Sequence, residues 1–139
     1  MLDFGLSIVW LDNNISRVEL LPRGRLFSEH PKIQQWIDAY LSKKPIPFPL
    51  PLDLNRLTPF TQKVLLEIQK IPYGHTKTYK EVAEAIGHPG AQRAVGSACG
   101  RNPYPLFIPC HRVVGYNNMG GYSCAQSIKM LLYTLECTK

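Results

Sequence analysis

The sequence predicts an α+β protein in which a small N-terminal portion of β-hairpin and helix is joined to a mainly helical, winged helix-turn-helix-like domain. Two apolar, β-branched runs flank a turn near the N-terminus, and helical spacing of apolar residues dominates the second half. A proline-rich stretch separates the two parts. The 139 residues, 45% hydrophobic and 19% charged, are enough to form a core.

The first portion, residues 1–44, is expected to fold as strand, turn, strand and helix. Strands are predicted over 6–11 and 15–21, on either side of the turn-forming Asp-Asn-Asn at 12–14. A helix is predicted over 31–41, with a proline in its first turn and apolar side chains on one face. These side chains are Ile33, Trp36, Ile37 and Tyr40. No residue pattern in this portion indicates chemistry.

A proline-rich segment over residues 45–56 divides the chain. Its four prolines stand at alternate positions, a pattern that favours an extended, semi-rigid backbone. We therefore expect a linker here, with a separate domain over residues 57–139.

Short helices are predicted to begin this second domain. The first spans 60–71, where apolar residues recur at helical spacing. Thr78 and Glu81 have the spacing of a capping box and open a second helix, which ends at Gly87. A third helix is expected over 89–100. Two short helices joined by a brief turn indicate a helix-turn-helix.

The third of these helices has unusually small side chains. Ala94, Gly96 and Ser97 follow Arg93, the one long charged residue near its start. A thin helix of this kind can enter a nucleic-acid groove, with Arg93 as the reading residue. The alternative is a helix packed closely on another helix, with Arg93 merely solvated.

A reactive segment follows inside the apolar run over residues 106–114, which we expect to be a buried strand or a strand-like segment. Cys110 and His111 stand in its middle, where polar groups are costly unless partnered. A thiol beside a base is the usual source of a nucleophilic thiolate. Because neighbours in a strand point to opposite faces, the pair would need a turn at Pro109 and Cys110 or a bridging water. The alternative is a buried, inert cysteine.

The C-terminal segment is predicted to be a loop over 115–121 and a helix over 125–135. Ser123 and Gln126 have the spacing of an N-terminal capping box. The residues expected to point inward are Ile128, Leu131, Leu132 and Leu135. Glu136 follows at the C-terminal end, where the helix dipole disfavours an anion. Such a carboxylate either has a specific partner or is solvated where the helix frays.

Charge is distributed unevenly along the chain. Residues 57–139 hold five of the six net positive charges, and no acidic residue occurs over 86–134. A basic face without acidic residues favours polyanions, nucleic acid first. The alternative is a solvated basic surface without a partner.

The cysteines do not indicate a metal site. Cys99, Cys110, Cys124 and Cys137 form no C-x-x-C pair, so we expect neither zinc nor a disulfide framework. Reduced thiols, with no convincing signal peptide or membrane-spanning stretch, predict a cytoplasmic protein. In a eukaryotic source, the nucleus is the expected alternative.

Three motifs together resemble the O6-alkylguanine-DNA alkyltransferases, also called methylated-DNA–protein-cysteine methyltransferases. These motifs are Arg-Ala-Val-Gly at 93–96, Asn-Pro at 102–103 and Pro-Cys-His-Arg-Val at 109–113. The resemblance covers residues 57–136 and extends more weakly through 47–53 and the first hairpin.

The resemblance implies a set of catalytic residues. Cys110 matches the alkyl acceptor, and His111 matches the base that deprotonates it through a water. Glu136 matches the carboxylate that orients this histidine. Asn102 matches the residue that ties the active-site turn together, and Tyr79 matches the tyrosine that assists the leaving guanine.

It also implies how substrate and DNA are bound. Tyr122, Ser123 and Val113 match residues at the guanine pocket, where the Ser123 backbone donates near O6. The carbonyls of Cys110 and Val113 match those that read the exocyclic amine.

Arg93 matches the arginine that fills the space left by the flipped base. Ala94, Gly96 and Ser97 belong to the helix that the family seats in the minor groove. The implied partner is therefore double-stranded DNA that contains alkylated guanine.

The implied function is single-turnover repair, in which an alkyl group moves from O6-alkylguanine to Cys110. O4-alkylthymine is a second candidate lesion. No cofactor is expected, and we expect a monomer. Cys124 and Ala125 stand where the family usually has Gly-Gly, which puts the pocket shape in question. Two other classes stay open: a lesion-binding protein without chemistry, and a Cys–His hydrolase.

Overall fold

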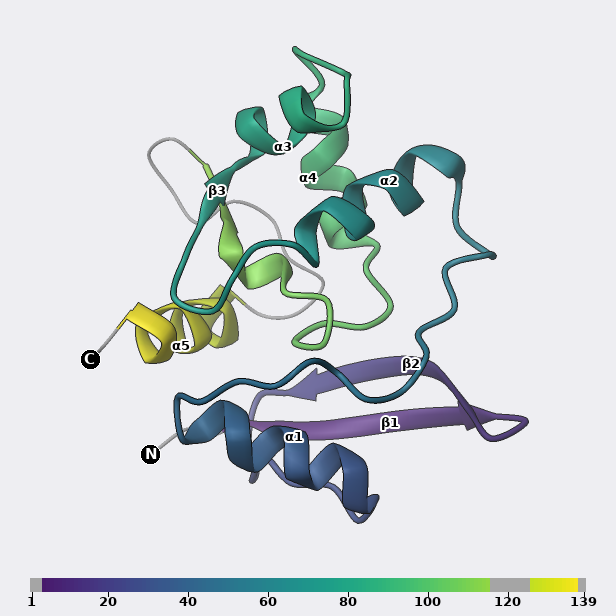
Figure 1. The fold of residues 1–139 in the computed structure, drawn as a ribbon, viewed down its shortest axis with the longest axis vertical. Helices are drawn as coiled ribbons and strands as arrows, with labels where there is room; N and C mark the ends of the chain where they lie inside the picture. The colour runs from purple at the N-terminus through teal and green to yellow at the C-terminus, as the bar shows by residue number, and fades with distance from the viewer. Residues whose placement is uncertain (1–3, 116–125, 138–139) are drawn as a thin grey trace.

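The computed structural model describes residues 4–115 and 126–137, and it confirms the α+β class (Figure 1). The elements, in chain order, are β1 (Gly5–Leu11), β2 (Asn14–Leu21), α1 (Pro31–Leu41), α2 (Pro59–Ile68), β3 (Lys77–Thr78), α3 (Tyr79–Ala85), α4 (Gln92–Gly100), the 3-10 turn η1 (Cys110–Arg112), β4 (Val113–Val114) and α5 (Gln126–Cys137). The hairpin and α1 lie at one end of the molecule, and α2, α3 and α4 lie at the other (Figure 1).

Strands β1 and β2 form the predicted antiparallel hairpin, with a turn one residue shorter than expected. Asp12 and Asn13 occupy the turn with φ of 50° and 66°, while Asn14 already pairs with Leu11. Positive φ at both turn residues matches the right-handed twist of the flanking strands, and Asp and Asn tolerate it better than most residues.

Helix α1 is confirmed with the predicted bounds, and all four predicted inward side chains are buried. They face a core shared with the second half of the chain. The Trp36 ring packs edge-on against Phe107 at 5.2 Å, and the Val18 N–H donates to the Pro103 carbonyl at 2.8 Å. The N-terminal portion is therefore built into the core, while the division into domains stays a prediction.

Helices α2, α3 and α4 pack against one another. Helix α2 ends at Ile68, three residues earlier than expected, although Ile71 is still buried. Helix α4 begins at Gln92 and not at Pro89. The cause is Gly90, whose φ of 88° lies in the left-handed region and interrupts the helical backbone.

The predicted capping box of α3 is confirmed. The Glu81 N–H donates to Thr78 Oγ1 at 3.1 Å, and the Thr78 N–H donates to Glu81 Oε1 at 2.9 Å. The helix ends at Ala85, and Gly87 follows with a φ of 80°. These contacts place Tyr79 at the first position of α3.

The strand predicted over 106–114 is wrong in most of its length. Only Val113 and Val114 form a strand, which pairs in parallel with β3. Before them the backbone makes a 3-10 turn, in which the Arg112 N–H donates to the Pro109 carbonyl at 2.9 Å. Pro109 has no N–H for a sheet ladder, so a turn is favoured at this point. A turn at Pro109 and Cys110 was one of the two arrangements that the sequence required.

Helix α5 differs from its prediction on its inward face. Ile128 and Leu132 are buried as expected, but Leu131 is 36% exposed. Lys129 is instead completely buried. The capping box predicted at Ser123 and Gln126 lies outside the described residues. Within residues 4–115 and 126–137, none of the helices has the length and apolar character needed to cross a membrane.

Candidate active site

The site is built around Cys110, the first residue of η1, whose side chain is completely buried. Asn102, just after α4, donates from Nδ2 to Cys110 Sγ at 3.1 Å. The same Nδ2 donates to the Ile108 carbonyl at 2.9 Å, and the Tyr104 N–H donates to Asn102 Oδ1 at 2.8 Å. Asn102 therefore holds both the sulfur and the chain that leads to it.

The chain held by Asn102 includes a strained position. Leu106 has a φ of 75°, which is unfavourable for a branched side chain and costs roughly 1–2 kcal/mol. The Ile108 N–H closes the surrounding turn by donating to the Tyr104 carbonyl at 2.8 Å. Strain of this kind persists only where neighbouring contacts determine the backbone, as Asn102 does here.

His111 lies one residue beyond Cys110, and its imidazole is completely buried. Nε2 of His111 forms a short hydrogen bond with Glu136 Oε2. Because Nε2 faces a carboxylate, it carries the proton in the neutral ring, and Nδ1 is the nitrogen that accepts another. Burial lowers the pKa of His111, against the opposing effects of the Glu136 hydrogen bond and charge. The neutral form, which can act as a base, is therefore favoured.

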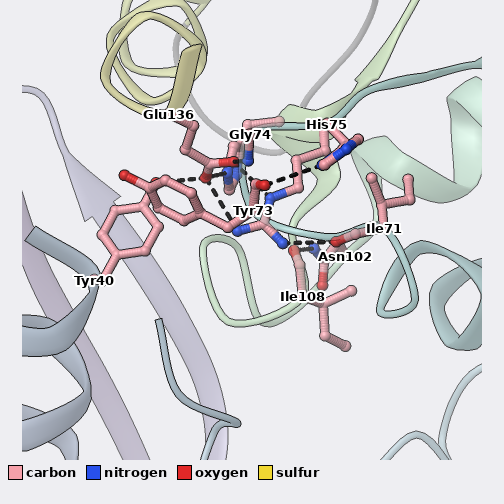
Figure 2. Close-up of polar contacts among 10 residues, drawn as sticks. Tyr40, Ile71, Tyr73, Gly74, His75, Asn102, Ile108 and Glu136 are labelled. Atoms are coloured by element: carbon pink, nitrogen blue, oxygen red, sulfur yellow. Dashed lines mark hydrogen bonds and ion pairs between the residues drawn. The ribbon is translucent and has the colours of Figure 1, made fainter. Parts of the chain in front are cut away.

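Glu136 is the hub of the polar network in Figure 2. Its Oε1 accepts from Arg112 Nε at 2.7 Å and from the Gly74 N–H at 3.2 Å. Its Oε2 accepts from the Tyr40 hydroxyl at 2.6 Å and from Arg112 Nη2 at 3.2 Å, in addition to His111. The carboxylate that the helix dipole disfavours thus has specific partners, which resolves the alternatives left open by the sequence.

The electrostatics agree with this geometry. Burial by itself raises the pKa of Glu136, but the hydrogen bond and charge of His111, with those of Arg112, outweigh it and hold the pKa at about 2. Arg112 is held in turn by the Ile71 carbonyl, which accepts from Nη1 at 2.8 Å. Glu136 is therefore ionised at any pH at which a protein normally works.

The Cys110 thiol needs help to ionise. Burial raises its pKa well above the ordinary value, a hydrogen bond shared with the buried Cys99 raises it further, and Asn102 and Lys129 lower it. The sulfur is therefore a thiol in the resting protein. A nearby base must remove its proton when it reacts.

Tyr79 is linked to this region through Lys129, on α5. Lys129 Nζ donates to the Tyr79 hydroxyl at 3.2 Å and lies 5.6 Å from the centre of its ring. Burial lowers the pKa of Lys129 to about 8, while the charges of Cys99 and Cys110 oppose this effect. Because an ammonium only donates, the Tyr79 oxygen accepts this bond and its own O–H points elsewhere.

Helix α4 shows a different surface. Val95, Ala98 and Cys99 are buried on its inner side. Its outer side carries Arg93, Ala94 and Ser97, all exposed, with Gly96 half-buried between the two sides. The small residues therefore form part of an open surface, with Arg93 near the start of the helix.

The structure thus brings Cys110, His111, Glu136 and Asn102 together. Val113 is buried directly after η1, and Arg93 lies on a separate, exposed surface. Tyr122 and Ser123 lie outside the described residues. Within the described ranges, no three His, Cys, Asp or Glu side chains are grouped as metal ligands.

Three contributors were missed from the sequence. Arg112 appeared only as a motif letter, although it binds Glu136 directly. Lys129 could have been found as a cation three residues before Leu132 on the inward face of the last helix. The first portion, where no residue pattern indicated chemistry, contributes Tyr40, whose hydroxyl contacts Glu136. Its burial was predicted, but no sequence signal pointed to its partner.

Comparison with known proteins identifies the family. The model of the 6-O-methylguanine DNA methyltransferase DNA-binding domain matches residues 59–138. A probable methylated-DNA–protein-cysteine methyltransferase of Acanthamoeba polyphaga mimivirus is 52% identical over 86 residues, which cover 61% of this chain and 58% of the relative. The methylated-DNA–protein-cysteine methyltransferase of Mycobacterium leprae (strain TN) is 43% identical over 122 residues, which cover 87% of this chain and 72% of the relative.

A solved structure agrees with these matches. The crystal structure of Mycobacterium tuberculosis OGT in complex with DNA is similar at a TM-score of 0.80 and 33% identity, over 95% of this chain and 86% of that one. The chain spans less than two thirds of the mimivirus relative and nearly three quarters of the Mycobacterium leprae one. The chain therefore belongs to the 6-O-methylguanine DNA methyltransferase, or methylated-DNA–protein-cysteine methyltransferase, family.

Proposed function

We propose that this protein repairs DNA by moving an alkyl group from the O6 of guanine to Cys110, irreversibly and once per molecule. The observation that carries this proposal is the 3-10 turn at Cys110, which joins the sulfur held by Asn102 to the His111–Glu136 pair. O6-methylguanine is the primary substrate, and O4-alkylthymine is a second candidate.

The reaction follows from the positions of the groups. His111 accepts the thiol proton of Cys110 at Nδ1, through a water, and Glu136 stabilises the resulting imidazolium. The thiolate forms a bond to the alkyl carbon while the bond from that carbon to guanine O6 breaks. The electron pair of the broken bond stays on guanine, which then takes up a proton. A thioether is not cleaved by water or by a general base, so the protein reacts once.

Tyr79 assists the leaving guanine in this scheme. Its hydroxyl oxygen accepts from Lys129, so its O–H can donate to the base as negative charge develops there. The ammonium of Lys129 strengthens this donor by favouring charge on the phenol oxygen. The same positive charge favours the Cys110 thiolate.

Binding of DNA is assigned to α4, the second helix of a helix-turn-helix formed with α3. The small side chains on its exposed side allow close approach to a groove, and Arg93 can occupy the space of an extruded nucleotide. A relative of similar structure was crystallised with DNA. We propose that the chain acts as a monomer in the cytoplasm, or in the nucleus of a eukaryote, without a cofactor.

Intact mass measurement tests the proposal. The protein is incubated with duplex DNA containing one O6-methylguanine, and an unmodified duplex serves as the control. We expect a mass gain of one methylene, on Cys110, at no more than one per molecule. No gain, or repeated turnover with release of the alkyl group, would contradict the proposal.

A further inference from the structure

We propose that Tyr40, on helix α1, is a positioning residue for the reaction and makes the N-terminal portion part of the active site through Glu136. Its hydroxyl donates to Glu136 Oε2 at 2.6 Å across 96 positions of sequence. That oxygen also binds His111. The inference rests on the proposed alkyl transfer, because it assigns Tyr40 a role in that reaction.

The position of Tyr40 is tightly determined. The residue is 1% exposed, and its ring stacks on Trp36 at 5.2 Å and meets the Tyr73 ring edge-on at 5.4 Å. Figure 2 shows the Tyr40 hydroxyl directed at the Glu136 carboxylate. Because two aromatic neighbours fix the Tyr40 hydroxyl, it holds the Glu136 carboxylate in one rotamer. Helix α1, which carries Tyr40, carries none of the other site residues.

The hydroxyl remains a donor throughout the working range of pH. Burial raises the pKa of Tyr40 well above its ordinary value, and the charge of Glu136 raises it further. Tyr40 therefore keeps its proton and directs it at the carboxylate. The bond draws negative charge from the oxygen that faces His111.

This withdrawal of charge affects the proton affinity of His111. A carboxylate with one donor fewer stabilises the imidazolium more strongly, so the pKa of His111 rises when the Tyr40 bond is lost. Among the described residues, the other ionisable groups facing the pair are Arg112, Lys129 and Tyr73, and all three are retained when Tyr40 alone is changed. We infer that Tyr40, with Arg112, helps to keep His111 neutral and able to accept the thiol proton.

Tyr40→Phe tests the proposal, because it keeps the ring and removes only the donor. Tyr73→Phe is the matched control: the Tyr73 hydroxyl is buried in the same cluster, and it has no hydrogen-bond partner among the described residues. Single-turnover rates on O6-methylguanine duplex are measured between pH 5 and pH 9, with unfolding midpoints recorded for both variants. These pH limits bracket roughly the range in which histidine titrates.

On the acidic side of the profile, where the raised pKa leaves more His111 protonated, we expect the Tyr40→Phe rate to fall by up to about tenfold, the scale of one hydrogen bond to a charged group. The ratio of wild-type to variant rate should grow as the pH falls, because the acidic limb moves to higher pH. The Tyr73→Phe profile should keep its shape. A purely structural role would lower the Tyr40→Phe rate by the same factor at every pH, and that result would overturn the proposal.

A double-mutant cycle keeps the test decisive if Tyr40→Phe is less stable. Combining it with Glu136→Gln should add little further loss of rate, because Tyr40 acts through that carboxylate. Full additivity would overturn the proposal. If the wild-type protein takes up no alkyl group, the proposed function fails instead, so the two failures are distinguishable.

Discussion

The buried cluster at Glu136 and the exposed side of α4 are organised in opposite ways. Glu136 is held by α1, by the loop after α2 and by η1, through donors from four residues. The Arg93 side chain has no hydrogen bond or ion pair with another residue of the described part of the chain. One region is fixed before any substrate arrives, and the other presents a cation to the solvent.

The difference follows from what each region must do. Buried charges are tolerated only with partners, so a site that moves a proton and stabilises an anion must be assembled in advance. A surface that meets a polyanion can stay solvated, because its charges gain partners on binding. We therefore expect changes in the cluster to alter chemistry and stability, and changes on the exposed side of α4 to alter only the handling of duplex DNA.

The largest effect is expected for Cys110→Ser. Alkyl transfer should disappear, because a serine hydroxyl is not ionised by this site, while affinity for duplex DNA should be kept. The measurement is intact mass after incubation with O6-methylguanine duplex, beside a binding titration. Cys137→Ser, at an exposed cysteine, is the control and should react like the wild type. Alkylation of Cys99 in the variant would show that Cys110 is not the sole acceptor.

Stability in acid distinguishes the buried cluster from the surface. The pKa of Glu136 is about 2 in the folded protein against an ordinary 4.5. A carboxylate whose pKa is lowered by folding stabilises the folded state at any pH above its ordinary pKa. This stabilisation is lost as the pH falls from the ordinary pKa through the pKa of the folded state. Glu136→Gln should therefore reduce the free energy of unfolding by about 3 kcal/mol at neutral pH and flatten its decline in acid.

Denaturant unfolding between neutral and acidic pH measures this effect. Glu84→Gln, at an exposed carboxylate of α3, is the matched control and should change little. Equal curves for the wild type and Glu136→Gln would mean that the network around Glu136 contributes no stability.

Much of the fold could be predicted because the decisive signals are local. The hairpin, α1 and the α3 capping box depend on periodicity and turn residues within a few positions of one another. In two places a single residue overrode the predicted pattern: Gly90 delays α4, and Pro109 turns a predicted strand into a 3-10 turn.

The site was less predictable, because its contacts cross the whole chain. Cys110 and His111 could be selected because polar groups in an apolar run are costly. The resemblance, and not the spacing, supplied the partnership with Glu136. In the sequence, Tyr40 is indistinguishable from any other buried aromatic residue, and Lys129 from any other helix lysine, so neither stands out as a site residue. Only the fold shows that one donates to Glu136 and the other to Tyr79.

Arg93→Ala tests the exposed region. Loss of the side chain that fills the extruded nucleotide's place should slow repair of duplex DNA by about tenfold at saturating DNA. Reaction with O6-benzylguanine base should be unchanged, since it requires no extrusion. Arg101→Ala, at the other end of α4, also removes one positive charge. It should weaken DNA binding, but it should not slow the reaction at saturating duplex DNA relative to the reaction with the free base. Equal losses of Arg93→Ala on both substrates would place Arg93 in the chemistry.

Lys129→Met is expected to have the smallest effect on the rate of alkyl transfer. It should lower this rate without lowering the stability of the protein. Methionine fills a similar volume, and replacing a buried ammonium by an apolar side chain of this size is often neutral or stabilising. The unfolding midpoint should therefore be kept or raised. The rate should fall about fivefold, the scale of one hydrogen bond, because Tyr79 loses its donor and Cys110 a nearby positive charge.

The pH profile makes the Lys129 assignment specific. Burial lowers the pKa of Lys129 to about 8, so the ammonium is present below that pH and lost above it. The wild-type rate should carry an alkaline decline near this value, superimposed on the rise from thiol ionisation, and Lys129→Met should lack it. Lys63→Met, at an exposed lysine of α2, controls for the change in net charge. If the rate depends on alkaline pH in the same way in the wild type and in Lys129→Met, Lys129 only fills space. The reaction would then depend on His111 and Glu136 without Lys129.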